Sequence, residues 1–297
     1  MATVEELVAR SKAAQKQFEF ATQEQADAAA KAICKVVYDH QEELGKLAAE
    51  ETRMGKVEDK IAKCRNKSSQ IWTSIKNRKS VGVINRLEDK RMLEIAKPMG
   101  VVASVVPSTN PVVTPMSNAA FALKCRNSVI FTPHPRAVKC TRLLVDMFRA
   151  ELKKLGFPED LVLMVDVVSN EESAKLMAAC DVVVATGGMG MVKAAYSSGK
   201  PALGVGAGNT PAIIDDSADI ILAVNSIIHS KTFDNGMICA TEQNVIVLDG
   251  IYDKVKAEFQ KRGCYFVKQG AEMEALRAAM FKNGALDHRI PGMAAAK

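Results

Sequence analysis

The stretch Val101-Val-Ala-Ser-Val-Val106 decides the fold of this chain. An apolar run without polar alternation indicates a β-strand that is buried on both faces. Similar runs follow at Ser128-Val-Ile-Phe-Thr132, Leu161-Val-Leu-Met-Val165 and Asp181-Val-Val-Val-Ala-Thr186, and stretches with helical spacing separate them. Repeated strand–helix–strand units with right-handed crossovers predict an α/β fold with a parallel, doubly wound, Rossmann-like sheet.

The residues before this sheet follow other patterns. Residues 3–50 carry apolar positions at helical spacing, and a further helix is expected through Trp72. Ser80-Val-Gly-Val-Ile84 and Arg91-Met-Leu-Glu-Ile-Ala96 are typical of two short strands around a polar turn. We expect this 80–96 hairpin to pair with another subunit, so that the chain forms a homo-oligomer.

The composition is that of an ordinary soluble globular chain of 297 residues, with 48% apolar residues, 25% charged residues and a net charge of +6. Residues 1–10 carry charges through their apolar pattern, which excludes a signal peptide, and no apolar run reaches the roughly 18 residues that span a membrane. The densest basic cluster, Lys76-Asn-Arg-Lys79, has no interleaved aromatic residues, so we expect no nucleic-acid partner. Seven cysteines without a Cys-x-x-Cys pair indicate reduced thiols in a cytoplasmic protein and no metal site.

Three loops are the predicted ligand-binding positions, because doubly wound sheets bind ligands beyond the carboxyl ends of their strands. These loops are 107–111, 133–135 and 186–190. Gly187-Gly-Met-Gly190 can cradle a phosphate ahead of a helix N-terminus, although the same glycines also suit a tight turn. His134 either contacts a cofactor or is simply exposed.

Two residues have features of a nucleophilic active site. Cys239 lies between the turn signal Asn235-Gly236 and the apolar run Asn244-Val-Ile-Val-Leu248, where a side chain can face a cleft. A thiolate is a strong nucleophile that nearby backbone N–H groups can stabilise, although a lone cysteine is more often a small buried hydrophobe. Flanking prolines hold the amide of Asn110 at a strand end, where it donates to an oxyanion or serves only in a turn.

Five ordered motifs resemble the CoA-acylating branch of the aldehyde dehydrogenase superfamily. This branch includes CoA-dependent succinate-semialdehyde dehydrogenases and the aldehyde dehydrogenase half of bifunctional aldehyde-alcohol dehydrogenases. The motifs are Pro107-Ser-Thr-Asn-Pro111, Thr132-Pro-His-Pro-Arg136, Ala185-Thr-Gly-Gly-Met-Gly-Met-Val-Lys-Ala-Ala-Tyr-Ser-Ser-Gly-Lys-Pro201, Gly204-Val-Gly-Ala-Gly-Asn-Thr-Pro211 and residues 230–243. The resemblance covers essentially the whole chain, and it implies an aldehyde dehydrogenase-like sheet followed by the start of a second α/β catalytic lobe.

The resemblance also implies a reaction. Cys239 attacks an aldehyde, a hydride then passes to NAD or NADP, and CoA accepts the acyl group from the resulting thioester, or the sequence runs backwards from acyl-CoA. Asn110 and the backbone N–H of Cys239 are the implied donors to the developing oxyanion. The residues that the resemblance assigns to the cofactor are Thr132, Pro133, His134, Thr186, Gly187, Gly188 and Gly206.

Val205 stands where hydrolytic members of the superfamily carry the glutamate that activates water. An alkyl side chain cannot accept a proton, so a thiol acceptor is favoured over water. Glu242 follows Cys239 closely and is the alternative base of a hydrolytic enzyme. Arg136 is a candidate partner for the 2′-phosphate of NADP, and a comparison of both cofactors with Arg136→Ala tests that assignment.

Members of the branch continue past the equivalent of residues 281–289, so we expect the remainder of the catalytic lobe to be absent. We assign residues 1–224 to an NAD(P)-binding domain, 225–290 to the N-terminal part of the catalytic domain and 291–297 to a tail. A truncated, non-catalytic remnant that binds nucleotide or a partner subunit is therefore a further alternative. The sequence leaves open the choice among acetaldehyde, succinate semialdehyde and sulfoacetaldehyde, and the choice between NAD and NADP.

Overall fold

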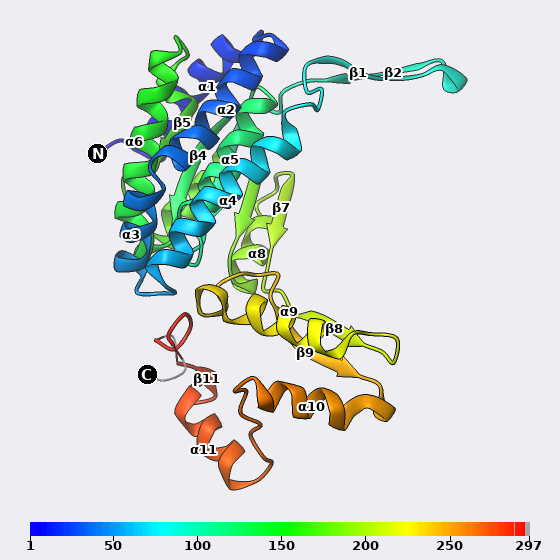
Figure 1. Cartoon of the computed structure of the whole chain (residues 1–297). Coiled ribbons are helices and arrows are strands. Elements are labelled where there is room, and N and C mark those ends of the chain that lie inside the picture. Colours follow the sequence, from blue (N-terminus) through cyan, green and yellow to red (C-terminus); the bar gives the residue numbers. More distant parts are fainter. Residues whose placement is uncertain (288, 295–297) are drawn as a thin grey trace. The chain divides into compact units, whose positions relative to one another are not determined.

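A parallel sheet of five strands lies at the centre of the first part of the chain (Figure 1). In strand order it comprises β5 (Val162–Met164), β4 (Ser128–Pro133), β3 (Val101–Val106), β6 (Val182–Thr186) and β7 (Ala202–Val205). Every neighbouring pair of these strands is parallel. In this computed structural model, which describes residues 1–287 and 289–294, the predicted doubly wound sheet is confirmed.

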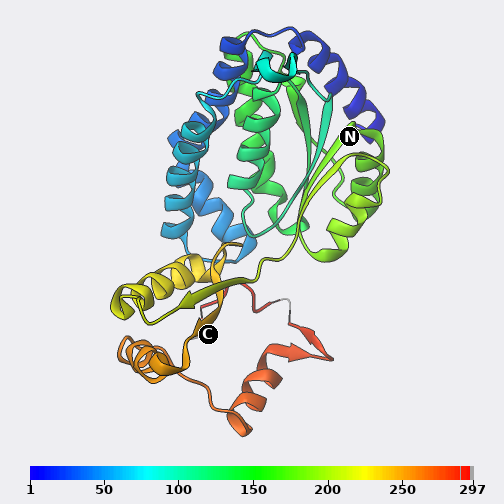
Figure 2. The same ribbon diagram turned by 90° about the vertical axis from the view of Figure 1, so that its right-hand side faces the viewer.

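Helices cover both faces of this sheet (Figure 2). Their bounds are α1 Val4–Phe18, α2 Gln23–Asp39, α3 Gln41–Thr52, α4 Val57–Ile75, α5 Val113–Lys124, α6 Val138–Lys154, α7 Asn170–Ala179 and α8 Met189–Tyr196. Side chains of β3 alternate between two apolar clusters, because successive residues of a strand point to opposite faces. Val102 and Val106 pack in the cluster formed with α2, α5 and α6. Val101, Ala103 and Val105 pack in the cluster formed with α1, α7 and α8.

Phe131 of β4 is the largest type of side chain in the first of these clusters, and it is 0% exposed. We expect Phe131→Ala to lower the free energy of unfolding by about 3–5 kcal/mol, because a close-packed core does not refill the volume of an aromatic ring. Phe20→Ala is the matched control, since Phe20 is 84% exposed, and should change this free energy by less than about 0.5 kcal/mol. Urea denaturation followed by circular dichroism measures both, and equal midpoints would contradict the prediction.

The predicted hairpin is confirmed, with antiparallel strands β1 (Gly82–Leu87) and β2 (Met92–Ala96). Figure 1 shows it extending away from the helices that cover the sheet. A short 3-10 turn, Glu88–Lys90, joins the two strands, and Arg91 after it adopts a left-handed backbone with φ 51°. The first strand begins later and runs further than residues 80–84, because cross-strand pairing continues as far as the turn.

The chain divides into two compact units. The first comprises Met1–Thr52 and Val57–Ala207, and the second comprises Arg53–Lys56 and the described residues from Gly208 onwards. The assignment of residues 1–224 to cofactor binding and of 225–290 to catalysis stays a prediction.

The second unit has a small sheet of its own, formed by the parallel strands β8 (Thr210–Ile214) and β9 (Glu242–Val247). Its other elements are α9 Ile220–Thr232, α10 Tyr252–Lys261, α11 Ala271–Met280, β10 Phe281–Lys282 and β11 Ala285–Leu286. Ile214, Val224 and Val255 form its buried core. The described residues 264–268, between α10 and α11, adopt no regular structure.

The tail predicted over 291–297 includes residues 295–297, which lie outside the described residues. In the described part, the carbonyl of Gly292 accepts hydrogen bonds from the backbone N–H of Gly55 at 2.8 Å and from Nδ2 of Asn235 at 2.9 Å. Across the described ranges 1–287 and 289–294, no helix has both the length and the apolar character to cross a membrane.

Candidate functional site

The order of the strands reverses between β3 and β6. The chain moves outward from β3 through β4 to β5, and it then returns to the opposite side of β3. Doubly wound sheets bind their ligands at this reversal, in the crevice outside the carboxyl ends of the strands. Because Asn110 follows β3 and Gly187 and Gly188 follow β6, the fold brings these predicted residues to one end of the sheet.

Asn110 lies in the bend between β3 and α5 and is partly exposed. Its backbone carbonyl accepts a hydrogen bond from the N–H of Thr114 at 3.2 Å. Its side-chain oxygen Oδ1 accepts a hydrogen bond from Nζ of Lys63 in α4 at 3.0 Å. With Oδ1 engaged by an ammonium, Nδ2 is the end of the amide that donates. Sequence patterns did not indicate Lys63, because lysine side chains are mostly exposed and its burial depends on the packing of α4.

The predicted cofactor residues at the end of β4 have partners of their own. Thr132 is 1% exposed, and its hydroxyl forms a 2.8 Å hydrogen bond with that of Ser173 in α7. Pro133 ends the strand opposite Val106 of β3. The structure therefore leaves Thr132 only its backbone for contact with a ligand beyond the strand ends.

His134 is exposed, and its Nδ1 accepts a hydrogen bond from the backbone N–H of Arg136 at 3.1 Å. Partial burial, and then the positive charge of Arg136, lowers the pKa of His134. Since the ordinary pKa of histidine is near 6.5, the side chain is neutral at neutral pH. A neutral ring that accepts at Nδ1 carries its proton on Nε2, so His134 presents a donor.

Thr186 ends β6, and Gly187 and Gly188 form the connection to α8. The N–H of Gly187 donates to the carbonyl of Val205 in β7 at 3.0 Å, which ties the loop to the neighbouring strand. Gly188 caps α8 without a side-chain hydrogen bond, and a Cβ there would meet no atom of the described residues within 4 Å. This helix N-terminus therefore has open space and backbone N–H groups, which is the environment that anions favour.

Gly206 follows β7 and lies close to the same helix. A Cβ at this position would stand 3.0 Å from Sδ of Met189, the first residue of α8. Glycine therefore lets the loops after β6 and β7 approach one another. Val205, one residue earlier, is 46% exposed and offers no group that accepts a proton.

Cys239 belongs to the second unit, where it occupies an exposed position in a tight turn. Both the backbone N–H and the hydroxyl of Thr241 donate to the carbonyl of Ile238, at 3.2 and 3.0 Å. The turn signal before it is confirmed, because Asn235 and Gly236 have φ values of 52° and 75°. A Cβ on Gly208 would stand 2.3 Å from the carbonyl oxygen of Cys239, so the two backbones are in close contact.

The buried cysteines contrast with Cys239. Burial raises the pKa of the Cys34, Cys140 and Cys180 thiols to about 12. At mildly alkaline pH we expect iodoacetamide to label Cys239 in the native protein and to leave these three unlabelled, because the thiolate is the reactive form. Peptide mass spectrometry before and after unfolding in urea measures the order, and early labelling of Cys140 would contradict it.

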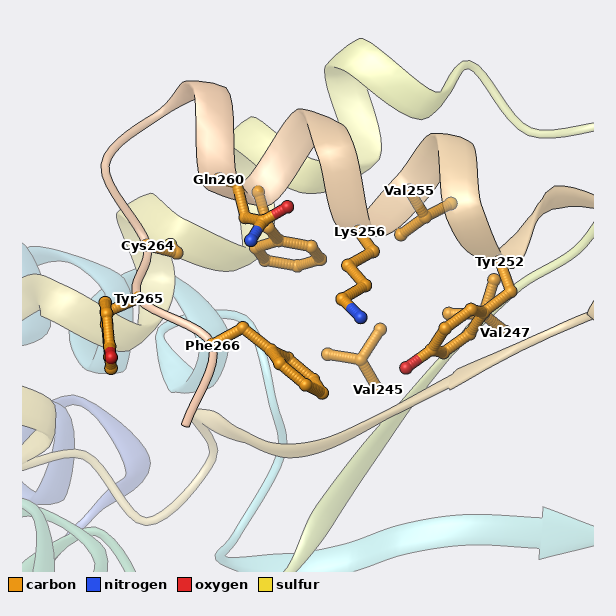
Figure 3. A pocket seen from close by; sticks show the side chains of 10 residues that line it. Val245, Val247, Tyr252, Val255, Lys256, Gln260, Cys264, Tyr265 and Phe266 are labelled. Carbon is orange, nitrogen blue, oxygen red and sulfur yellow. The ribbon is translucent and has the colours of Figure 1, made fainter. Parts of the chain in front are cut away.

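A hollow of about 290 Å³ lies in the second unit between β9, α10 and the segment after it. Figure 3 shows the side chains that line it, with Lys256 between two rings. The Lys256 ammonium lies 3.9 Å from the ring centre of Phe266 and 5.8 Å from that of Tyr252. None of the predicted site residues lines this hollow. Tyr252, Lys256, Gln260 and Tyr265 bring polar atoms to walls that are otherwise mainly apolar.

Comparison with known proteins identifies the family. The family described as "Aldehyde dehydrogenase family" matches residues 1–279. A succinate-semialdehyde dehydrogenase (acetylating) from Clostridium kluyveri is 48% identical over 290 residues, which cover 98% of this chain and 64% of that protein. The chain thus spans about two thirds of the length of this relative.

Two solved structures resemble the fold. An acetylating aldehyde dehydrogenase from Geobacillus thermoglucosidasius is 41% identical with a TM-score of 0.93, over 98% of this chain and 65% of that one. A propionaldehyde dehydrogenase from Rhodopseudomonas palustris, solved with bound CoA and an acylated cysteine, is 31% identical with a TM-score of 0.88, over 99% and 68%. The resemblance drawn from the five motifs is confirmed, and this chain belongs to the aldehyde dehydrogenase family.

Proposed function

We propose that the chain carries the nucleophile and the cofactor loops of a CoA-acylating aldehyde dehydrogenase. The reaction converts an aldehyde, CoA and NAD(P)+ into an acyl-CoA and NAD(P)H, and it is reversible. The observation that carries the proposal is that Cys239 is exposed in its turn of the second unit, while position 205 of the first unit offers only an alkyl side chain. Similarity to a protein solved with CoA and an acylated cysteine supports it.

In the proposed mechanism, the Cys239 thiol loses its proton and Sγ forms a bond with the aldehyde carbon. The carbonyl oxygen becomes an oxyanion, and Nδ2 of Asn110 and the backbone N–H of Cys239 donate hydrogen bonds to it. A nicotinamide cofactor held by the loops after β4, β6 and β7 would supply the acceptor for the hydride on this carbon, and the carbonyl would then re-form as a thioester. The CoA thiolate then attacks the thioester, and Sγ of Cys239 leaves as a thiolate.

Two features of the first unit fit a nicotinamide dinucleotide. The open N-terminus of α8 after Gly188 suits the pyrophosphate, because backbone N–H groups there face no side-chain cap among the described residues. The ring of His134 presents an Nε2 donor beside the same end of the sheet. These residues bind and orient the cofactor in the proposal, and neither takes part in bond making.

Transfer to CoA rather than to water follows from the absence of a base at position 205. A water molecule needs a general base to attack a thioester rapidly, and valine cannot supply one. A thiol is partly ionised near neutral pH, so it needs less assistance from a general base than water does. Glu242 is the nearest carboxylate to Cys239 in the sequence, and catalysis of water attack by this side chain would contradict the proposed transfer to CoA.

The deciding experiment measures NAD(P)H formation with and without CoA, for a panel of acetaldehyde, succinate semialdehyde and sulfoacetaldehyde. We expect the absorbance of NAD(P)H to increase only when CoA is present. In parallel, intact mass spectrometry after incubation with acyl-CoA should show one acyl group on Cys239. Nicotinamide reduction without CoA would instead support a hydrolytic enzyme, and Glu242→Gln would then be expected to abolish it. Absence of both turnover and acylation would overturn the proposal.

We further propose that the β1–β2 hairpin pairs with a second copy of this chain. Isolated two-stranded hairpins are marginally stable in water, and this one exposes Met92, Leu93 and Ile95 to 54%, 52% and 56%. The triple variant Met92→Ser, Leu93→Ser, Ile95→Ser should lower the mass measured by light scattering to that of a monomer. A wild-type chain that is already monomeric at micromolar concentration would contradict the proposal.

A further inference from the structure

Two lysines of α4 are buried beside the loop that carries Asn110. Lys60 and Lys63 are 3% and 6% exposed, although lysine side chains are almost never fully buried without partners. Lys63 Nζ donates to Oδ1 of Asn110 at 3.0 Å, and Lys60 Nζ donates to the carbonyl of Thr109 at 3.3 Å. Residues three apart lie on one face of a helix, so both ammonium groups reach the same loop.

The packing of α4 explains how these side chains reach that depth. A Cβ on Gly45 in α3 would stand 2.7 Å from Cγ1 of Ile61 and 2.8 Å from its backbone nitrogen. Glycine at this position therefore allows close approach of α3 and α4. The methylene chains of the two lysines then line a small hollow with Ala48 and Val112, and long side chains of this kind pack apolar stems while their charged ends meet polar groups.

The contact determines what the Asn110 side chain presents at the strand end. An amide without a partner at Oδ1 can rotate by half a turn and exchange its donor for an acceptor. An ammonium donates only, so its bond to Oδ1 selects the orientation in which Nδ2 is the free end of the amide. Hydrogen bonds to charged groups are also stronger than neutral ones, and linked hydrogen bonds polarise one another, so Nδ2 becomes the better donor.

We propose that Lys63 is a positioning residue, which holds and polarises the Asn110 amide as a hydrogen-bond donor to the oxyanion. This inference rests on the proposed function for its catalytic meaning, whereas the orientation of the amide is a property of the protein alone. Lys63 acts through Asn110 and touches no reacting atom. Removal of its charge should therefore lower kcat more than it changes KM.

The test compares three variants of the full chain and uses a fourth, Asn110→Asp, to assign a resonance. Lys63→Met keeps most of the apolar stem and removes the ammonium, while Lys63→Arg keeps a cationic donor. Lys124→Met is the matched control, because Lys124 is also buried, at 3% exposed, and pairs with Asp27 away from the loop. The readouts are kcat and KM, and the side-chain amide resonance of Asn110 in nitrogen-15 spectra, assigned by its loss in Asn110→Asp.

We expect Lys63→Met to shift the Asn110 amide resonance and to lower kcat by about 10- to 100-fold. This loss in kcat is smaller than the loss that follows removal of an entire oxyanion donor, because Asn110 itself remains. Lys63→Arg should keep the amide resonance and kcat close to their wild-type values. Lys124→Met should lower the stability of the protein and change neither the resonance nor kcat. An amide resonance that is the same in Lys63→Met and Lys124→Met would overturn the inference. If the wild type shows neither turnover nor acylation, the proposed function fails, and the resonance still decides whether Lys63 orients Asn110.

Discussion

Replacement of Cys239 by alanine should reduce acyl transfer from acyl-CoA, and CoA-dependent formation of NAD(P)H, by at least about 10⁴-fold. Both the attack on the aldehyde and the transfer of the acyl group to CoA use Sγ of this residue, so the variant cannot form the thioester. The exposed turn that carries Cys239 contributes little packing, and we expect the free energy of unfolding to change by less than about 0.5 kcal/mol. Intact mass spectrometry measures the acyl-enzyme, and urea denaturation measures the stability.

Cys264→Ala is the matched control for this variant. Cys264 lies in the same unit, is partly exposed, and lines the apolar hollow rather than the predicted site. It should keep the wild-type rate of acyl transfer. If Cys239→Ala still forms a stable acyl-enzyme while Cys264→Ala does not, the nucleophile has been assigned to the wrong residue.

Most of the sheet is predictable from the sequence, because its strands are apolar on both faces. The runs beginning at Val101, Ser128 and Asp181 became β3, β4 and β6 with boundaries within a residue or so. Strand order follows less directly, since it depends on which helices cover each face.

The site is predictable only in part, and for different reasons at each residue. Asn235-Gly236 predicted the turn before Cys239, because both residues tolerate positive φ. The roles of Cys239 and Asn110 came from a family resemblance, since thiols and amides of the same types occur throughout the chain. Lys63 was missed altogether, because its burial depends on how closely α4 packs against Gly45 in three dimensions.

Gly208→Ala tests whether the backbone around Cys239 must keep its present position. The added Cβ would stand 2.3 Å from the carbonyl oxygen of Cys239, and a backbone atom cannot move aside as a flexible side chain does. The turn must therefore shift, which displaces Sγ and the N–H that donates to the oxyanion. A misplacement of about 1 Å can cost about 10²-fold in rate, and overpacking of this kind costs about 1–3 kcal/mol of stability.

Gly250→Ala provides the control in the same unit, because a Cβ there meets no atom of the described residues within 4 Å. We expect the alanine at 208 to lower the rate of Cys239 acylation by about 10²-fold, and the alanine at 250 to leave that rate unchanged. Circular dichroism would establish that both variants keep their helices. Equal acylation rates would show that the turn tolerates the displacement. A selective loss at 208 would show that the glycine holds the nucleophile in its reactive position through backbone contact alone.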